Sequence, residues 1–164
     1  MEVTTKNNKN KAIKVISVNH EQEVGGVQIQ VPDLALSAEG LALYVKSSEK
    51  GKRDSANYLN AGNIEFRITD DQGKEITSHS GEVTGTRHLD KWIYSSEKTF
   101  SPIPKGVKEL TITPYTMLPN HGGGTELDKQ GNEEDIQFDY STLKNVKFNS
   151  FTVKIPHEKN NVFE

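Results

Sequence analysis

A segment rich in carboxylates lies between residues 120 and 135. It holds five acidic residues close to a run of glycines: Glu126, Asp128, Glu133, Glu134 and Asp135. Carboxylate oxygens are the ligands that Ca²⁺ prefers, and a glycine-rich segment can gather several of them around one ion. A solvated acidic loop is the commoner explanation of such a run of charge. If calcium binds here as a cofactor, we expect Asp128 and Asp135 to hold it.

Two aromatic residues, Trp92 and Tyr94, lie two positions apart and would share one face of a strand. If they are exposed, then together with Tyr115 they form a candidate ligand-binding surface on which a sugar ring can stack. If they are buried, they belong to an ordinary core. Large aromatic side chains are mostly buried, so the core interpretation is favoured for Trp92.

Other motifs lack the partners that their chemistry requires. The His-Gly-Gly-Gly run at residues 121–124 is similar to an oxyanion-hole loop, but the sequence has no Gly-x-Ser-x-Gly elbow. The Asp-Asp-Gln-Gly run at residues 70–73 lacks the alternating ligands of a calcium loop and is typical of a hairpin turn. A hydrolase that uses Glu133 with Asp135 would need a defined carboxylate separation, and no other feature supports it. We therefore expect the protein not to be an enzyme.

Cysteine and histidine give little indication of a metal site. The chain has no cysteine, which excludes thiol nucleophiles and zinc sites that contain Cys. Its five histidines are scattered and include no His-x-x-x-His pair. A zinc site would have to be assembled from distant parts of the chain.

The elements that position these residues alternate apolar and polar side chains with a period of two, for example at residues 27–31, 64–69 and 110–113. Such alternation predicts strands that are apolar on one face only. The strands expected are residues 12–19, 27–36, 41–45, 63–69, 74–77, 91–100, 110–115 and 151–155, with a further candidate at 136–140. Pro32 predicts an edge strand or a bulge. The pattern indicates an all-β fold, an antiparallel β-sandwich of about seven to nine strands.

The bulk properties suit one domain. The chain has 164 residues, 32% of them hydrophobic, and a net charge of −3. The sequence predicts a disordered leader at residues 1–10, the sandwich at 11–156 and a polar tail at 157–164. An isoelectric point near 6.0 argues against nucleic acid as a partner. The apolar runs are too short to cross a membrane, so membrane anchoring would need a segment absent from this chain.

One further feature is a combination of turn and strand signals. Residues 68–74 (Ile-Thr-Asp-Asp-Gln-Gly-Lys) are followed by Phe-Ser-Pro-Ile-Pro at 100–104 and Leu-Thr-Ile-Thr-Pro at 110–114. Together these resemble the immunoglobulin-like domain of unknown function in the extracytoplasmic C-terminal region of Gram-positive single-pass membrane proteins. Such proteins are encoded near extracytoplasmic-function sigma factors, and the resemblance implies an anti-sigma or sensor context. It covers about residues 11–156, implies an immunoglobulin-like fold, and transfers no functional residues; the Cys…Trp…Cys spacing of antibody domains is missing.

The function expected from the resemblance is that of a non-enzymatic, extracytoplasmic binding or sensing module at the cell surface, which contacts a protein or a cell-envelope ligand. Residues 47–60 and 119–135 are the longest predicted loops and hence candidate contact surfaces, since loops carry recognition. The alternatives are a carbohydrate-binding module and an immunoglobulin-like domain of a bacterial lipoprotein.

Overall fold

The computed structural model describes residues 3–8, 11–51, 60–79, 81–117, 124–127, 129–136 and 146–156. In these residues the chain forms twelve strands and one 3-10 turn, η2 (Asn60–Gly62). The strands are β1 (Val3–Asn8), β2 (Lys11–Val24), β3 (Val27–Ser37), β4 (Gly40–Lys50), β5 (Ile64–Thr69), β6 (Glu75–Ile76), β7 (Glu82–His88), β8 (Lys91–Phe100), β9 (Glu109–Thr116), β10 (Gly124–Leu127), β11 (Glu133–Ile136) and β12 (Phe151–Lys154).

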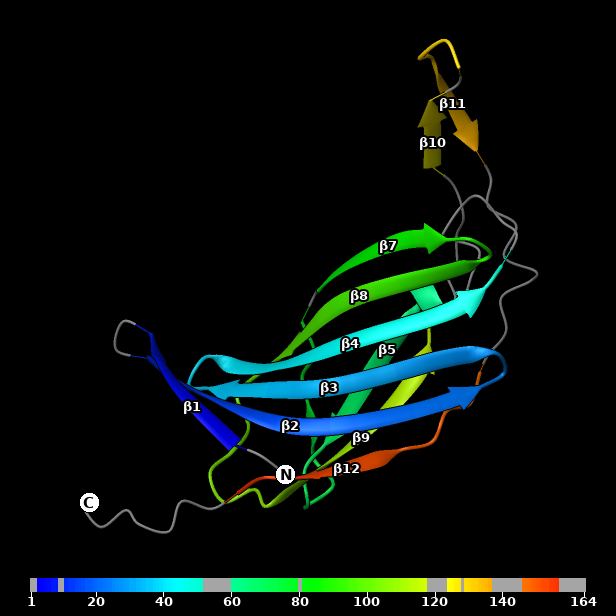
Figure 1. The fold of residues 1–164 in the computed structure, drawn as a ribbon. Coiled ribbons are helices and arrows are strands. Elements are labelled where there is room, and N and C mark those ends of the chain that lie inside the picture. Colours follow the sequence, from blue (N-terminus) through cyan, green and yellow to red (C-terminus); the bar gives the residue numbers. More distant parts are fainter. Residues whose placement is uncertain are drawn as a thin grey trace.

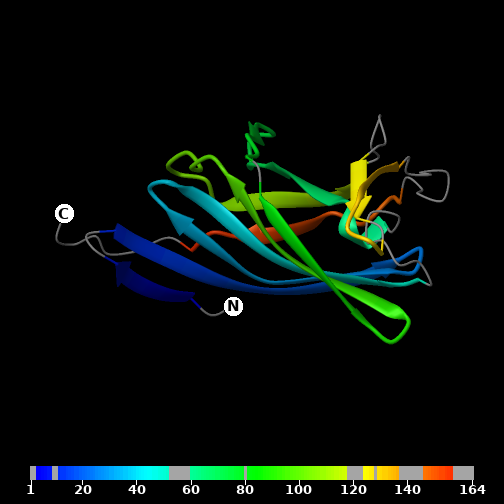
Figure 2. The ribbon, with the colours of Figure 1, turned by 90° about the horizontal axis from the view of Figure 1, so that it is seen from above.

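Two antiparallel sheets face each other in the arrangement that Figures 1 and 2 show. The large sheet has six strands in the order β1-β2-β3-β4-β8-β7, and the small sheet has four in the order β12-β9-β5-β6. Strands β10 and β11 form a separate hairpin. The chain leaves the large sheet after β4, forms β5 and β6, and returns for β7 and β8. The all-β sandwich that the alternation predicts is therefore confirmed.

The core lies between the inner faces of the two sheets. Residues that alternate along each strand supply it: Ile16, Val27, Ile29, Val31, Leu34, Leu41, Leu43 and Val45 from the large sheet, and Ile64, Phe66, Ile68, Leu110, Ile112 and Val153 from the small sheet. Each of these side chains is almost fully buried. Removal of this apolar surface from water is the main stabilising contribution to the fold.

Pro32 lies in β3, which is an interior strand of the large sheet. The register shifts between Ser17 and His20 where β2 pairs β3, and between Gln30 and Leu34 where β3 pairs β4. The bulge that Pro32 predicts is confirmed, and the edge-strand alternative is wrong. A bulge leaves backbone groups out of the ladder, so the missing N–H of proline is tolerated there.

Side chains join the two sheets along both open sides of the sandwich. On one side, the rings of His20 and Phe151 stack with centroids 3.8 Å apart, and the amide of Gln22 bonds the backbone N and O of Asn149. On the other side, the Nζ of Lys98 lies 3.3 Å from a carboxylate oxygen of Glu65. Lys98 is only 5% exposed, so this ion pair holds a charge that would otherwise be buried alone.

Strands β1, β7 and β10 lie where the alternation predicts none, and β11 meets the candidate strand at 136–140 only at Ile136. Residues 3–8 form β1 and pair with residues 11–16 of β2, which corrects the expectation of a disordered leader over residues 1–10. The hydrogen bonds of β1 come from backbone pairing with β2, so β1 needs no apolar pattern in its sequence. Strand β7 is also unmarked in the sequence, because all seven of its side chains are exposed.

The two predicted loops are shorter than expected. Residues 47–50 belong to β4, and residues 124–127 and 133–136 form the β10–β11 hairpin. Residues 52–59, 118–123 and 137–145 lie outside the described residues, as does the predicted tail at 157–164.

The β5–β6 hairpin confirms the turn predicted at residues 70–73. The Oδ1 atom of Asp70 accepts the backbone N–H of Gln72 at 2.8 Å and that of Lys74 at 2.9 Å. Asp70 is 6% exposed, so these bonds satisfy a buried carboxylate. The acid therefore fixes the turn, and its geometry requires no metal ion.

We predict that Asp70→Ala lowers the free energy of unfolding by about 2 kcal/mol, because two backbone donors lose their acceptor. Asp70→Asn keeps one side-chain oxygen and should lose less. Urea unfolding followed by circular dichroism measures both. Equal losses for the two variants would contradict this account of the turn.

Candidate functional site: the outer face of the large sheet

The outer face of the large sheet is the broad surface turned towards the viewer in Figure 1, and the described elements leave it uncovered. Strands β2, β3, β4, β8 and β7 each present alternate side chains there. Four depressions lie on this face, and the two around Tyr44 share lining residues. This face is therefore the candidate site.

The most apolar depression, here called the hollow, forms where small residues lie side by side on three neighbouring strands. Ala35 of β3 is directly opposite Ala42 of β4, and Ala42 is opposite Thr99 of β8. Larger side chains surround this row, with Ile13 on one side and Tyr44 and Glu97 on the other. Because cross-strand neighbours stand side by side on one face, three short side chains in a row leave a gap.

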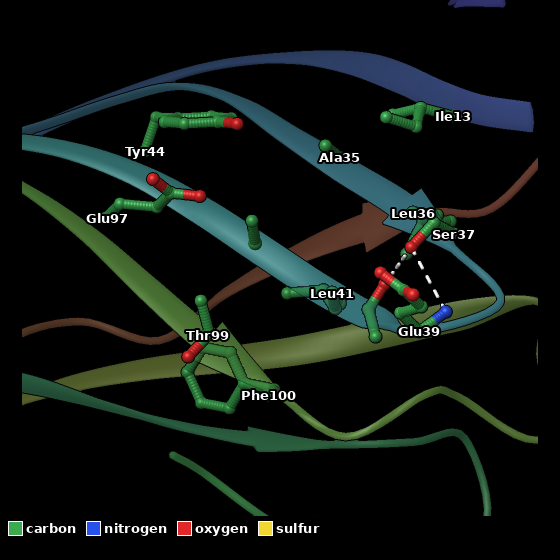
Figure 3. Close-up of a pocket in the computed structure, with 12 residues that line it drawn as sticks. Ile13, Ala35, Leu36, Ser37, Glu39, Leu41, Tyr44, Glu97, Thr99 and Phe100 are labelled. Atoms are coloured by element: carbon green, nitrogen blue, oxygen red, sulfur yellow. Dashed lines mark hydrogen bonds between the residues drawn. The ribbon is translucent and has the colours of Figure 1, made fainter. Parts of the chain in front are cut away.

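The hollow has a volume of about 240 Å³, which suits a side chain or a small chemical group. Figure 3 shows Tyr44 and Glu97 at one end and the β3–β4 turn at the other, where the backbone N–H of Glu39 donates to Ser37 Oγ. The turn lies close to the end of β8: a Cβ added at Gly40 would be 2.3 Å from the carbonyl oxygen of Phe100. Only glycine fits there.

The Tyr44 side of the hollow is negatively charged. Burial raises the pKa of the Tyr44 phenol above its ordinary value, and the carboxylates of Glu97 and Asp33 raise it further. The hydroxyl therefore stays protonated and can donate a hydrogen bond throughout the physiological range. An apolar floor with a hydroxyl and carboxylates at its rim can bind a group that has an apolar body and a polar or cationic end.

The opposite end of the same face is polar. A depression of about 100 Å³ is lined by amides, a hydroxyl, amines and one apolar residue: Gln28, Gln30, Ser48, Lys46, Lys91 and Ile93. Gln30 donates to Glu21 at 3.0 Å, which fixes its amide. The face thus changes from apolar and acidic near Tyr44 to hydrogen-bonding and basic near Lys91.

The three aromatic residues predicted to bind ligand do not lie together. Trp92 and Tyr94 both point to the inner face of β8, with ring centroids 6.2 Å apart. Tyr94 is 3% exposed and cannot offer a face to a sugar ring, whereas Trp92 is partly buried against the core. Tyr115 is 41% exposed, but it lies on the outer face of the small sheet. The three residues therefore do not form the shared aromatic surface that was the alternative for Trp92, Tyr94 and Tyr115, and Trp92 packs against the core as the favoured interpretation has it.

The glycine beside Tyr94 explains its burial. Gly85 of β7 is opposite Tyr94, and a Cβ there would lie 2.9 Å from the tyrosine ring. The ring occupies the space that a side chain at Gly85 would need. Burial also raises the pKa of the Tyr94 phenol strongly, with a further contribution from Glu49.

The two residues predicted to bind calcium, Asp128 and Asp135, lie mostly outside the part of the chain that the structure describes. Asp128 and the side chain of Asp135 are not among the described residues, and the backbone of Asp135 pairs with Thr125 in the β10–β11 hairpin. In the part of the chain that is described, no three His, Asp or Glu side chains cluster as metal ligands would. Calcium at these two residues stays a prediction.

Among the described residues, none forms a helix with the length and apolar composition that crossing a bilayer requires.

The fold and the exposed face together define an antiparallel β-sandwich domain with an open outer sheet face. The chain belongs to a family of unknown function, DUF5643, whose model matches residues 13–155. A solved structure, described as the crystal structure of the conserved domain protein from Bacillus anthracis, is similar in fold. Its TM-score is 0.53 at 17% sequence identity, and the match covers 88% of this chain and 49% of that one. This chain thus spans about half the length of that protein. No curated protein matches it.

Sequence reasoning missed the hollow, because its three small residues come from three strands. The alternation within one strand does not predict this row, because only the strand register brings Ala35, Ala42 and Thr99 side by side. The sequence does contain one sign of the hollow. Two of its positions hold alanine, whereas side chains on the outer face of a sheet are usually larger or more polar.

We predict that Glu97→Gln lowers the pKa of Tyr44 towards 10.0, because the variant removes a negative charge beside the phenolate. The pKa should stay above 10.0, since burial is the larger cause. Titration of the tyrosine ¹³Cζ resonance by NMR measures it. Glu109→Gln, on the small sheet, is the matched control. An unchanged Tyr44 pKa in Glu97→Gln would contradict the geometry of the rim.

Proposed function

We propose that this chain is a non-enzymatic, extracytoplasmic binding module with an immunoglobulin-like fold, part of a membrane-anchored regulator or surface protein. The observation that carries the proposal is the outer face of the large sheet, with the hollow beside Tyr44 at one end and the polar depression at the other. A sheet face holds its side chains at fixed spacing, so it can present a binding surface without reorganisation.

The chemistry of the face supports binding to the cell envelope or to an envelope protein. Its apolar hollow accepts a small group, while Gln28, Gln30 and Ser48 supply donors and acceptors to a polar chain alongside. Sites of this kind combine an apolar pocket with a few fixed polar groups. The fold also occurs within a longer chain in the Bacillus anthracis structure, where the match is 49% of the polypeptide.

We predict that the chain co-sediments with isolated Gram-positive cell envelopes, and that Ala42→Phe weakens this binding at least tenfold by filling the hollow. The matched control is Thr111→Phe, which adds the same ring to the outer face of the small sheet and should bind as the unmodified chain does. Thermal unfolding of both variants checks that the sandwich is retained.

Two results would contradict the proposal. One is an unmodified chain that stays in the supernatant at every envelope concentration. The other is equal binding by Ala42→Phe, Thr111→Phe and the unmodified chain, which would place the contact on another surface.

A further inference from the structure

Strand β7 forms one end of the large sheet and is exposed along its whole length. All seven residues from Glu82 to His88 are exposed, and β8 is its partner in the sheet. Figure 2 shows the β7–β8 hairpin turning away from the small sheet, so that neither face of β7 is covered by it. One edge of β7 thus presents backbone N–H and C=O groups on which another strand can pair.

Strand β7 lacks three of the devices that block such an edge: a bulge, a proline and a lysine. Its register with β8 runs through seven consecutive pairs without a bulge, from Glu82↔Glu97 to His88↔Lys91. The strand contains neither proline nor lysine. Natural sheets protect a free edge with these residues or with a bulge. A regular edge that carries Glu82, Arg87 and His88 can pair with another strand where the side chains of that strand complement these charges.

The pairing of β7 with β8 places two like charges side by side at one end of β7. Glu82 is directly opposite Glu97, and His88 is directly opposite Lys91. Like charges opposite each other in a sheet are destabilising, and opposite charges are stabilising. A strand that paired with the outer edge of β7 would offset the Glu82–Glu97 contact if it placed a basic or hydrogen-bond-donating residue beside Glu82.

A second copy of β7 has this pattern. Antiparallel pairing about Gly85 sets Glu82 opposite the His88 of the other copy, because the two residues lie three positions on either side of the glycine. The same register sets Thr84 opposite Thr86, and Val83 opposite Arg87, whose aliphatic stem can cover the exposed valine. The Glu82–His88 and Thr84–Thr86 pairs can each form a hydrogen bond across the two strands.

We propose that two copies of this chain associate through their β7 strands, antiparallel and centred on Gly85, to form one continuous sheet of twelve strands. The contact is isologous, as in most symmetric dimers. It places the outer faces of both large sheets on the same side, because directly opposite residues in a sheet point to one face. A single strand pair buries less surface than standard interfaces do, so the dimer is expected to be weak.

The test is sedimentation equilibrium of the full chain at concentrations up to several hundred micromolar. We expect a reversible dimer for the unmodified chain. His88→Glu sets two acidic residues opposite each other, and Glu82→Lys does the same with two basic ones, so each variant alone should dimerise at least tenfold more weakly. Glu23→Lys, on the exposed outer face of β2, is the matched control and should dimerise normally.

Mixing the two variants separates the proposal from a general loss of folding. A Glu82→Lys chain and a His88→Glu chain form complementary pairs at both ends of the strand, so the mixture should recover the dimer that neither forms alone. The proposal is overturned if the unmodified chain stays monomeric throughout, if either variant alone dimerises as the unmodified chain does, or if the mixture associates no better than its components.

Discussion

The packing of two one-sided apolar sheets against each other is the constraint on which the rest of this structure depends. Each strand of the core has its apolar residues on one face, so neither sheet can exclude water from them alone. The contact fixes which side chains face inwards, and the His20–Phe151 stack and the Lys98–Glu65 ion pair close its two sides. Because the inner faces must stay apolar to form the core, the side chains on the outer face of the large sheet can change without loss of this packing.

That freedom explains how a binding surface can arise without cost to the fold. The hollow depends on small residues at Ala35, Ala42 and Thr99, none of which is needed to fill the core between the sheets. The same reasoning applies to β7, which extends the large sheet beyond the small one and so contributes its backbone pairing but no core side chain. The proposed binding face and the proposed dimer edge are thus adjoining parts of one sheet.

The sequence predicts those features that follow from the period of two and from turn chemistry. It predicts the sandwich, most of its strands, the hairpin at residues 63–77 and the bulge at Pro32. It does not reveal β1, β7 or the β10–β11 hairpin, because a strand that is held by backbone pairing needs no apolar alternation. It also cannot bring Ala35 beside Ala42 and Thr99, since that contact depends on strand register, which distant parts of the chain determine together.

We propose that recognition takes place on the outer face of the large sheet, and an NMR map of the contact is the decisive test of this proposal. A ¹⁵N-labelled chain would be titrated with soluble fragments of Gram-positive cell envelopes, and the shifts of its backbone amides followed. The account predicts that the largest shifts cluster at Ala35, Ala42, Tyr44 and Thr99. Shifts confined to the small sheet around Tyr115, with the hollow unaffected, would contradict it.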